Sequence, residues 1–267
     1  MPPRMWGMTA SYFRRTSPTT YLATGHTSGA WAVDEQHIAP ALGLLAHLLE
    51  EDFRARHPHP MFLARLSFDI YGTMPIAEIS FEVEVLRPGR TIELVEARLW
   101  CGQRQIVSAR GWFLSERDTT ALADTSLAPI PAPGEHRRWD PSALWAGGAL
   151  ETIEVRRDLA EPGRGTVWVD TDLPLVDDAE ASALARAVGL LDFANGMSTR
   201  ADPAEVAFPN LDLTVHFFRR PARGPVGLDT TVSFGPSGVS LTHSVLHDAH
   251  GPVGASSQLL TVRPSPA

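Results

Sequence analysis

The chain lacks most of the features that mark secreted and membrane-spanning proteins. It has a single cysteine, Cys101, among 267 residues, which excludes an intramolecular disulfide and a zinc site built from several cysteines. No stretch approaches the roughly 18 consecutive apolar residues of a membrane-spanning helix. The first residues, MPPRMWGMTASYFRR, contain no apolar core of the signal-peptide type. These absences predict a soluble, cytoplasmic protein.

Positive charge is in deficit. The chain carries 23 lysine and arginine residues against 31 aspartate and glutamate residues, for a formal net charge of −8. This balance argues against attraction to nucleic acid or to an anionic membrane surface. One short basic run, His136-Arg137-Arg138, lies in a proline-rich stretch and does not alter that conclusion. We therefore expect no nucleic-acid partner and no membrane partner.

Several motifs that indicate a particular chemistry are also missing. The sequence has no Gly-x-Ser-x-Gly elbow for a nucleophilic serine, and no glycine-rich loop of the phosphate-binding or dinucleotide-binding type. His243, His247 and His250 have no cysteine or carboxylate companion at the spacing of a metal site. Cys101 falls at a predicted turn without a positioned histidine. We expect no metal ligand and no cofactor.

What the chain does contain is an internal duplication. Residues Arg65–Leu114 and Asn210–Val262 both read as four strands separated by turns, and the matching turns are about 145 to 149 residues apart. Glycines stand at corresponding turns, Gly89 with Gly238 and Gly102 with Gly251. The polar positions of the two copies differ, which suggests that one active site remains where an ancestral pair existed.

Each copy follows an amphipathic segment with helical spacing, Ile38–Glu51 in the first and Ala179–Ala194 in the second. Asp177 or Asp178 is expected to cap the second helix. Alternating apolar residues predict strands at Leu150–Leu159 and Thr166–Asp172. Strand-rich units that each contain one long helix predict the α+β class.

The expected organisation is a first unit over residues 1–118, a linker rich in proline and alanine over 119–148, and a second unit over 149–267. Two tryptophans in the linker, Trp139 and Trp145, indicate that it packs on the protein instead of hanging free in water.

Three polar residues of the second copy stand out among apolar neighbours. Asp192 lies on or beside the apolar stripe of its helix, and the matching place in the first helix, around His47, has no aspartate. Asn210 precedes Asp212 by two residues and shares its face of a predicted strand. Gln258 is alone among small and apolar residues of the last strand. Each residue also has an explanation without a function. Asp192 could cap the helix end or be solvated, Asn210 could lie on a solvated strand face, and Gln258 could lie on an exposed edge strand.

From about residue 20 to 264 the chain resembles the double hotdog proteins of the acyl-CoA thioesterase II family. The resemblance rests on EVEVLRPGRTIELVEARLWCGQRQIVSARGWFL in the first unit and on LLDFANG, FPNLDLTVHFFRRP and GPVGASSQLLTVR in the second. It implies two tandem units, each with an antiparallel sheet wrapped around a long central helix. It also implies hydrolysis of an acyl-CoA or a related thioester. Whether the chain assembles into a homo-oligomer is left undecided by the sequence.

In that family an aspartate, a threonine or serine and a glutamine hold the hydrolytic water, and these positions correspond to Asp192, Asn210 and Gln258. Asn210 departs from the hydroxyl residue but keeps hydrogen-bonding capacity. Asp212 is implied to support the structure. Gly29 and Trp31 are implied to line the substrate channel. A backbone amide near the start of the first central helix could polarise the thioester carbonyl, although Pro40 has no N–H to offer.

Two other functions compete with hydrolysis. A non-catalytic binder of acyl groups or small ligands is consistent with Asn210 and Pro40. A hotdog hydratase or dehydratase would need a histidine with the aspartate of the central helix, and LLDFANG supplies none. Four arginines could meet the phosphates of CoA, although charges at strand ends are more often simply solvated: Arg87, Arg90, Arg219 and Arg220.

Overall fold

The computed structural model describes residues 10–264, so the outermost ends of the two expected units, residues 1–9 and 265–267, lie outside the described part. The elements of the first half are β1 (Phe13–Ser17), β2 (Thr20–Ala23), the 3₁₀ turn η1 (Gly25–Thr27), α1 (Ile38–Arg56), β3 (Phe62–Ile70), β4 (Glu78–Arg87), β5 (Ile92–Cys101) and β6 (Arg104–Leu114).

The middle of the chain contains η2 (Thr120–Leu122), η3 (Pro133–Glu135), β7 (Arg137–Trp139), η4 (Pro141–Ala143) and α2 (Gly148–Glu151). The elements of the second half are β8 (Glu154–Glu161), β9 (Arg164–Asp170), α3 (Ala183–Val188), α4 (Phe193–Met197), β10 (Val206–Ala207), β11 (Asp212–Phe217), β12 (Val226–Phe234), β13 (Val239–Asp248), β14 (Gly251–Thr261) and β15 (Arg263–Pro264).

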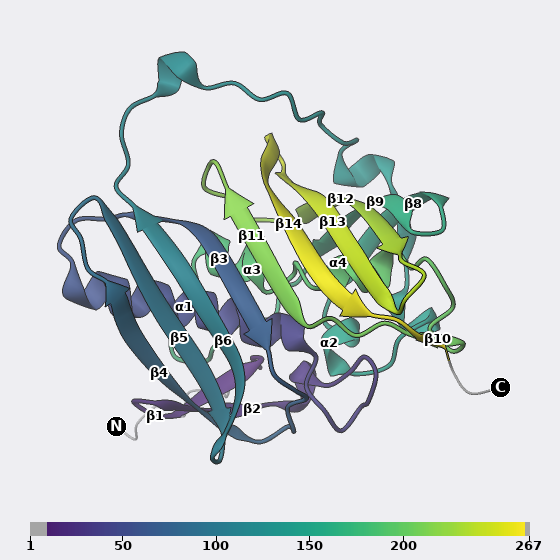
Figure 1. Ribbon diagram of the computed structural model, residues 1–267, viewed down its shortest axis with the longest axis horizontal. Coiled ribbons are helices and arrows are strands. Elements are labelled where there is room, and N and C mark those ends of the chain that lie inside the picture. The colour runs from purple at the N-terminus through teal and green to yellow at the C-terminus, as the bar shows by residue number, and fades with distance from the viewer. Residues whose placement is uncertain (1–9, 265–267) are drawn as a thin grey trace, which may run out of the picture.

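One antiparallel sheet runs through both halves. Among the described residues its order is β1-β2-β4-β5-β6-β3-β11-β14-β13-β12-β9-β8-β7, and β10 pairs with β15 in a separate ribbon. The order reads β4-β5-β6-β3 on one side of the centre and β11-β14-β13-β12 on the other, which is the mirrored arrangement expected of a duplicated unit. Strands β3 and β11 join the halves, with Ser67 opposite Thr214 (Figure 1).

Helix α1 confirms the first predicted helix and extends it to Arg56. His37 is its N-cap, and the ring Nδ1 accepts a hydrogen bond from the Ala39 amide at 3.1 Å. Arg54 and Arg56 in the last turn suit the negative end of the helix dipole. The helix lies against one face of the first-half strands (Figure 1).

The second predicted helix, Ala179–Ala194, is wrong in both extent and continuity. It begins at Ala183, where the Ser182 hydroxyl accepts a hydrogen bond from the Ala185 amide at 3.0 Å, and it is broken into α3 and α4. Asp177 and Asp178 do not cap it because both bind Arg15, through its backbone amide and its guanidinium respectively. The long second central helix is therefore absent.

Two further expectations need correction. The start of the predicted strand Leu150–Leu159 is the short helix α2, and the strand β8 begins only at Glu154. Asn210 lies before strand β11, in an isolated bridge with Leu260, and not within a strand shared with Asp212. The predicted strand Thr166–Asp172 corresponds to β9, displaced by two residues.

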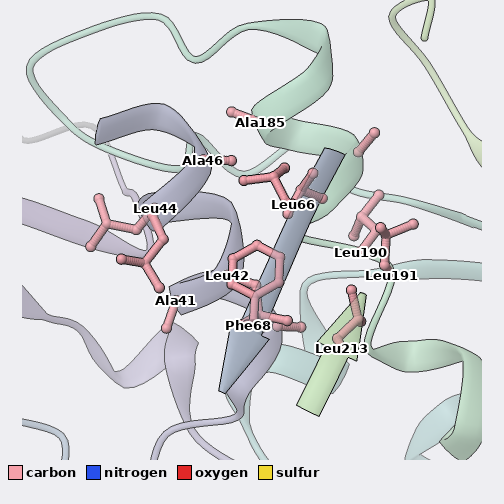
Figure 2. Packing of buried hydrophobic residues seen from close by; sticks show 14 of the residues in the cluster. Ala41, Leu42, Leu44, Ala46, Leu66, Phe68, Ala185, Leu190, Leu191 and Leu213 are labelled. Atoms are coloured by element: carbon pink, nitrogen blue, oxygen red, sulfur yellow. The ribbon is translucent and has the colours of Figure 1, made fainter. Parts of the chain in front are cut away.

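The core forms where the helices of the two halves cross on the shared sheet. A side chain on Gly43 of α1 would meet the Gly189 Cα at 2.9 Å, so glycine at this position allows the two helices to approach. Apolar side chains from α1, β3, β11 and the Leu190–Leu191 turn fill the space around the crossing (Figure 2). The close backbone approach fixes where the turn after α3 lies.

The segment after β6 runs as an extended arc beside the second half before it returns to the sheet at β7 (Figure 1). Trp145 is 6% exposed, and Arg157 lies over the ring of Trp139 at 3.4 Å from its centroid. Both tryptophans are therefore packed on the protein. None of the helices described over residues 10–264 is long and apolar enough to cross a membrane.

The helix crossing makes a prediction. Gly43→Ala should lower the free energy of unfolding by about 1–3 kcal/mol, because the new methyl group overpacks the contact with Gly189. Urea unfolding would measure the change. Gly134→Ala is the matched control, since a methyl group there meets no atom within 4 Å. An equal effect of the two substitutions would contradict this account of the crossing.

Candidate active site

A cavity of about 450 Å³ lies at one end of the β3–β11 junction, where the halves meet. Four segments line most of it: the loop before α1, the residues after β3, the start of α4 and the approach to β11. The first two come from the first half and the others from the second. The cavity therefore depends on the pairing of the two halves.

Asp192 reaches this cavity from the N-cap of α4 and is 4% exposed. Its neighbours in the chain, Leu191 and Phe193, are also buried. Burial disfavours the ionised carboxylate and raises the pKa of Asp192 from an ordinary 3.8 to about 7, and a hydrogen bond from Asn210 opposes this rise. A carboxyl group that titrates near neutrality can exchange protons at working pH.

Asn210 also lines the cavity and touches Asp192 directly. Its Nδ2 donates a hydrogen bond to Asp192 Oδ1 at 2.5 Å. Asn210 is held by its bridge to Leu260, and the next residue, Leu211, bonds through its backbone to both neighbouring strands: its amide donates to Leu259 O at 2.8 Å and its carbonyl accepts from Ile70 N at 2.9 Å. One Nδ2 hydrogen is used by the carboxylate, so the second N–H and the amide oxygen of Asn210 remain for other hydrogen bonds.

Gln258 lies next to this pair but does not line the cavity. Its Nε2 donates to the carbonyl of Leu191, the residue before Asp192, at 3.3 Å. Its Oε1 is buried without a hydrogen-bond partner among the described residues, as is the hydroxyl of Thr242, the residue opposite it on β13. Asp212 accepts a hydrogen bond from the Leu259 amide at 2.6 Å and supports the strand end.

His37 was not foreseen as part of this site, because 155 residues separate it from Asp192 in the sequence. Its Nδ1 is 3.7 Å from Asp192 Oδ2, too long for a hydrogen bond. Burial lowers the pKa of His37 to about 4, so the ring is neutral. Since Nδ1 accepts from Ala39, the proton lies on Nε2, and the ring has no free lone pair with which to act as a base.

Gly29 and Trp31, the residues implied to bind substrate, both line the cavity. Two aromatic residues that the sequence analysis did not place here join Trp31: Trp145 at a ring-centroid distance of 5.0 Å and Phe208 at 5.2 Å, both edge to face. Trp145 had been recognised only as a packing residue of the linker. No local pattern could have placed it beside Trp31.

The arginines singled out from the sequence lie elsewhere. Arg219 binds Asp248 through two hydrogen bonds, and Arg220 binds Glu116 in the same way. Arg263 is the arginine that lines the cavity. Over residues 10–264, no group of three or more His, Cys, Asp or Glu side chains is arranged to hold a metal ion.

Two family profiles match the chain. Residues 27–114 match the acyl-CoA thioesterase N-terminal domain, and residues 120–262 match the acyl-CoA thioesterase C-terminal domain. A comparison with curated protein sequences gave no significant match.

Solved structures share the fold over nearly the whole chain. A protein of unknown function with a hot dog fold from Alicyclobacillus acidocaldarius has a TM-score of 0.73 at 13% identity, covering 95% of this chain and 96% of its own. A provisionally named thioesterase from Novosphingobium aromaticivorans has a TM-score of 0.71 at 21% identity, and the match covers 94% of this chain and 98% of that one. An acyl-CoA thioesterase II from Mycobacterium marinum has a TM-score of 0.66 at 17% identity, covering 95% of both chains. These similarities establish the hotdog fold.

The buried carboxyl group predicts how stability depends on pH. Its folded-state pKa is raised, so its favourable contribution is fully present below about pH 4 and is lost as the pH rises through about 7. Relative to Asp192→Asn, whose amide oxygen can still accept from Asn210, the wild type should lose about 2–4 kcal/mol of unfolding free energy across this window. Urea unfolding at a series of pH values measures this difference.

Asp172→Asn removes an exposed carboxylate and serves as the control for this series. Its unfolding free energy should follow that of the wild type at every pH. A difference between wild type and Asp192→Asn that stays constant with pH would contradict a raised pKa at Asp192.

Proposed function

Because the chain belongs to the acyl-CoA thioesterase family, we propose that it hydrolyses a fatty acyl-CoA to the free acid and CoA, using water activated by Asp192 with Asn210 and Gln258. The observation that carries the proposal is the contact between the Asn210 amide and the buried Asp192 carboxyl group, inside a cavity large enough for a ligand. We interpret the two halves as tandem hotdog units, with α1 as one central helix and the broken α3–α4 as the other.

The reaction needs a base, and Asp192 is the candidate. Its ionised carboxylate takes a proton from water while the water oxygen forms a bond to the thioester carbonyl carbon. The tetrahedral intermediate then collapses, the C–S bond breaks, and the proton goes to the departing CoA sulfur. A thioester is a reactive acyl donor, so a positioned water and a base are sufficient without a covalent enzyme intermediate.

Asn210 and Gln258 have different parts in this proposal. The amide oxygen of Asn210 orients the attacking water by accepting a hydrogen bond from it, while one N–H of Nδ2 holds Asp192. Gln258 holds the carbonyl of Leu191 and thereby the turn that presents the carboxylate, so it supports the site from outside the cavity lining.

The start of α1 is the candidate for polarising the thioester carbonyl. Helix N-termini attract negative charge because their first amides have no partner within the helix. Ile38 lines the cavity at this end of the helix. The Ala39 amide is bound to His37 and Pro40 has no N–H, so the amide of Ile38 is the donor that we assign to the developing oxyanion.

A non-catalytic acyl-binding protein is the second candidate. The observation that favours it is Asn210, which cannot provide the hydroxyl of the family pattern. Such a protein would bind an acyl-CoA in the cavity and release no thiol from any chain length. Hydration or dehydration is not favoured, because the His37 lone pair that a base would need is already engaged with Ala39.

The proposal predicts the effect of two substitutions on thiol release. Asp192→Asn should lower kcat by about 10²–10⁴-fold, the range for loss of a general base. Asn210→Ala should leave part of the activity and move the acid limb of the pH profile upward, because its hydrogen bond holds the pKa of Asp192 down. A thiol-trapping assay over a pH series measures both effects.

Asp172→Asn should behave as the wild type in the same assay. Full activity of a folded Asp192→Asn protein would contradict the assignment of the base. Binding of acyl-CoA by the wild type without thiol release would favour the binding protein.

Arg263 gives a separate prediction about CoA. Arg263→Ala should raise KM for acyl-CoA several-fold while leaving KM for the matching acyl-N-acetylcysteamine thioester unchanged, since only CoA carries phosphates. Steady-state kinetics with both substrates measure the change in KM for each thioester. Arg87→Ala is the control, because it removes an exposed arginine outside the cavity. Arg219→Ala would not serve, since the ion pair of Arg219 with Asp248 is structural. An equal rise of KM for the two thioesters would contradict phosphate binding.

A further inference from the structure

The walls of the cavity bear on which acyl group it can take. We propose that this cavity selects a compact acyl group, short or ring-bearing, with an aromatic acyl thioester as the best fit, over a long unbranched chain. This inference rests on the proposed hydrolysis of an acyl-CoA, and it departs from that proposal in the acyl group, which is compact instead of a general fatty chain.

The interior behind the cavity is filled with side chains. A long acyl chain that extended inward from Asp192 would pass between the helices and the sheet. That space is occupied by close-packed side chains that are at most 1% exposed, namely Leu42 of α1, Leu66 and Phe68 of β3, Leu191, and Leu213 of β11 (Figure 2). Because solvent does not reach these side chains, an acyl chain could enter this space only by displacing them.

The cavity itself is small. Its volume of about 450 Å³ is towards the lower end of the range of about 300–1,000 Å³ that is usual for small-molecule sites. The same space must also admit the end of the pantetheine arm, because the thioester has to reach Asp192. The volume left for the acyl group is therefore small.

One wall of the cavity is aromatic. Trp31, Trp145 and Phe208 meet edge to face, with Trp145 and Phe208 at a centroid distance of 5.9 Å. Trp145 is fixed by a hydrogen bond of 2.9 Å from its Nε1 to the carbonyl of Gly196, which also lines the cavity. Ring clusters of this kind bind a further planar group through stacked or edge-to-face contacts.

These three aromatic residues come from distant parts of the chain: the loop before α1, the middle segment and the approach to β11. Trp145 and Phe208 are 6% and 2% exposed, whereas Trp31 is 45% exposed. The two buried rings form a fixed wall, and Trp31 is the partly exposed ring beside them in the cavity lining. Truncating Trp31 therefore changes the acyl site with little risk to folding.

The test compares kcat/KM for phenylacetyl-CoA, hexanoyl-CoA and palmitoyl-CoA, each below its micelle concentration. Phenylacetyl-CoA and hexanoyl-CoA should exceed palmitoyl-CoA by at least about tenfold, the lower bound for discrimination by a hydrophobic pocket. Trp31→Ala should lower kcat/KM for phenylacetyl-CoA by about two- to tenfold and reduce the preference over palmitoyl-CoA. Phe218→Ala is the control, because it removes a similarly exposed ring outside the cavity. It should change neither kcat/KM for phenylacetyl-CoA nor the preference over palmitoyl-CoA.

Binding separates failure of this inference from failure of the proposed function. S-phenethyl-CoA and S-hexadecyl-CoA are thioethers that cannot be hydrolysed, and isothermal titration gives their affinities for wild type and Trp31→Ala. Tighter binding of the phenethyl compound, weakened in Trp31→Ala, supports the inference even if no thioester is turned over. Equal or tighter binding of the hexadecyl compound, or palmitoyl-CoA as the best substrate, overturns it and leaves hydrolysis in place.

Discussion

The pairing of β3 with β11 is the constraint on which the rest of the molecule depends. It joins two strand-rich halves into one continuous sheet and sets the ends of both strands beside one cavity. The loop before α1, from the first half, thereby meets the turn that carries Asp192, from the second. Neither half alone contains this cavity, so the site depends on the pairing of the two halves.

The duplication is symmetric in its strands and asymmetric in its polar residues. Gly43 and Gly189 lie against each other where the helices cross, which sets the two copies in register. Three residues beyond Gly189 the second copy has Asp192, whereas three residues beyond Gly43 the first has the buried Ala46. A buried carboxyl group costs free energy unless it is neutral or paired. Its presence in one copy only is the pattern expected of a functional residue.

The sequence was sufficient to predict those parts of the fold and of the candidate site that depend on local sequence pattern. Helix α1, the succession of four strands in each copy and the polar residues Asp192 and Asn210 followed from periodicity, repetition and resemblance, and the structure brings these two side chains together. Contacts between distant segments could not be predicted. Ser182 replaced the expected aspartate caps because Arg15 engages both aspartates, and Trp145 joined the cavity from a segment without periodicity. The roles of the site residues stay predictions.

The central claim is that one buried carboxyl group, Asp192, titrates near neutrality and activates water. The most direct measurement is a ¹³C NMR titration of the Asp192 carboxyl carbon, compared with the pH dependence of thiol release by the same protein. The account predicts that both have a midpoint near 7. An Asp192 carboxyl group that titrates near its ordinary value of 3.8, or a kinetic midpoint that differs from the NMR midpoint, would contradict it.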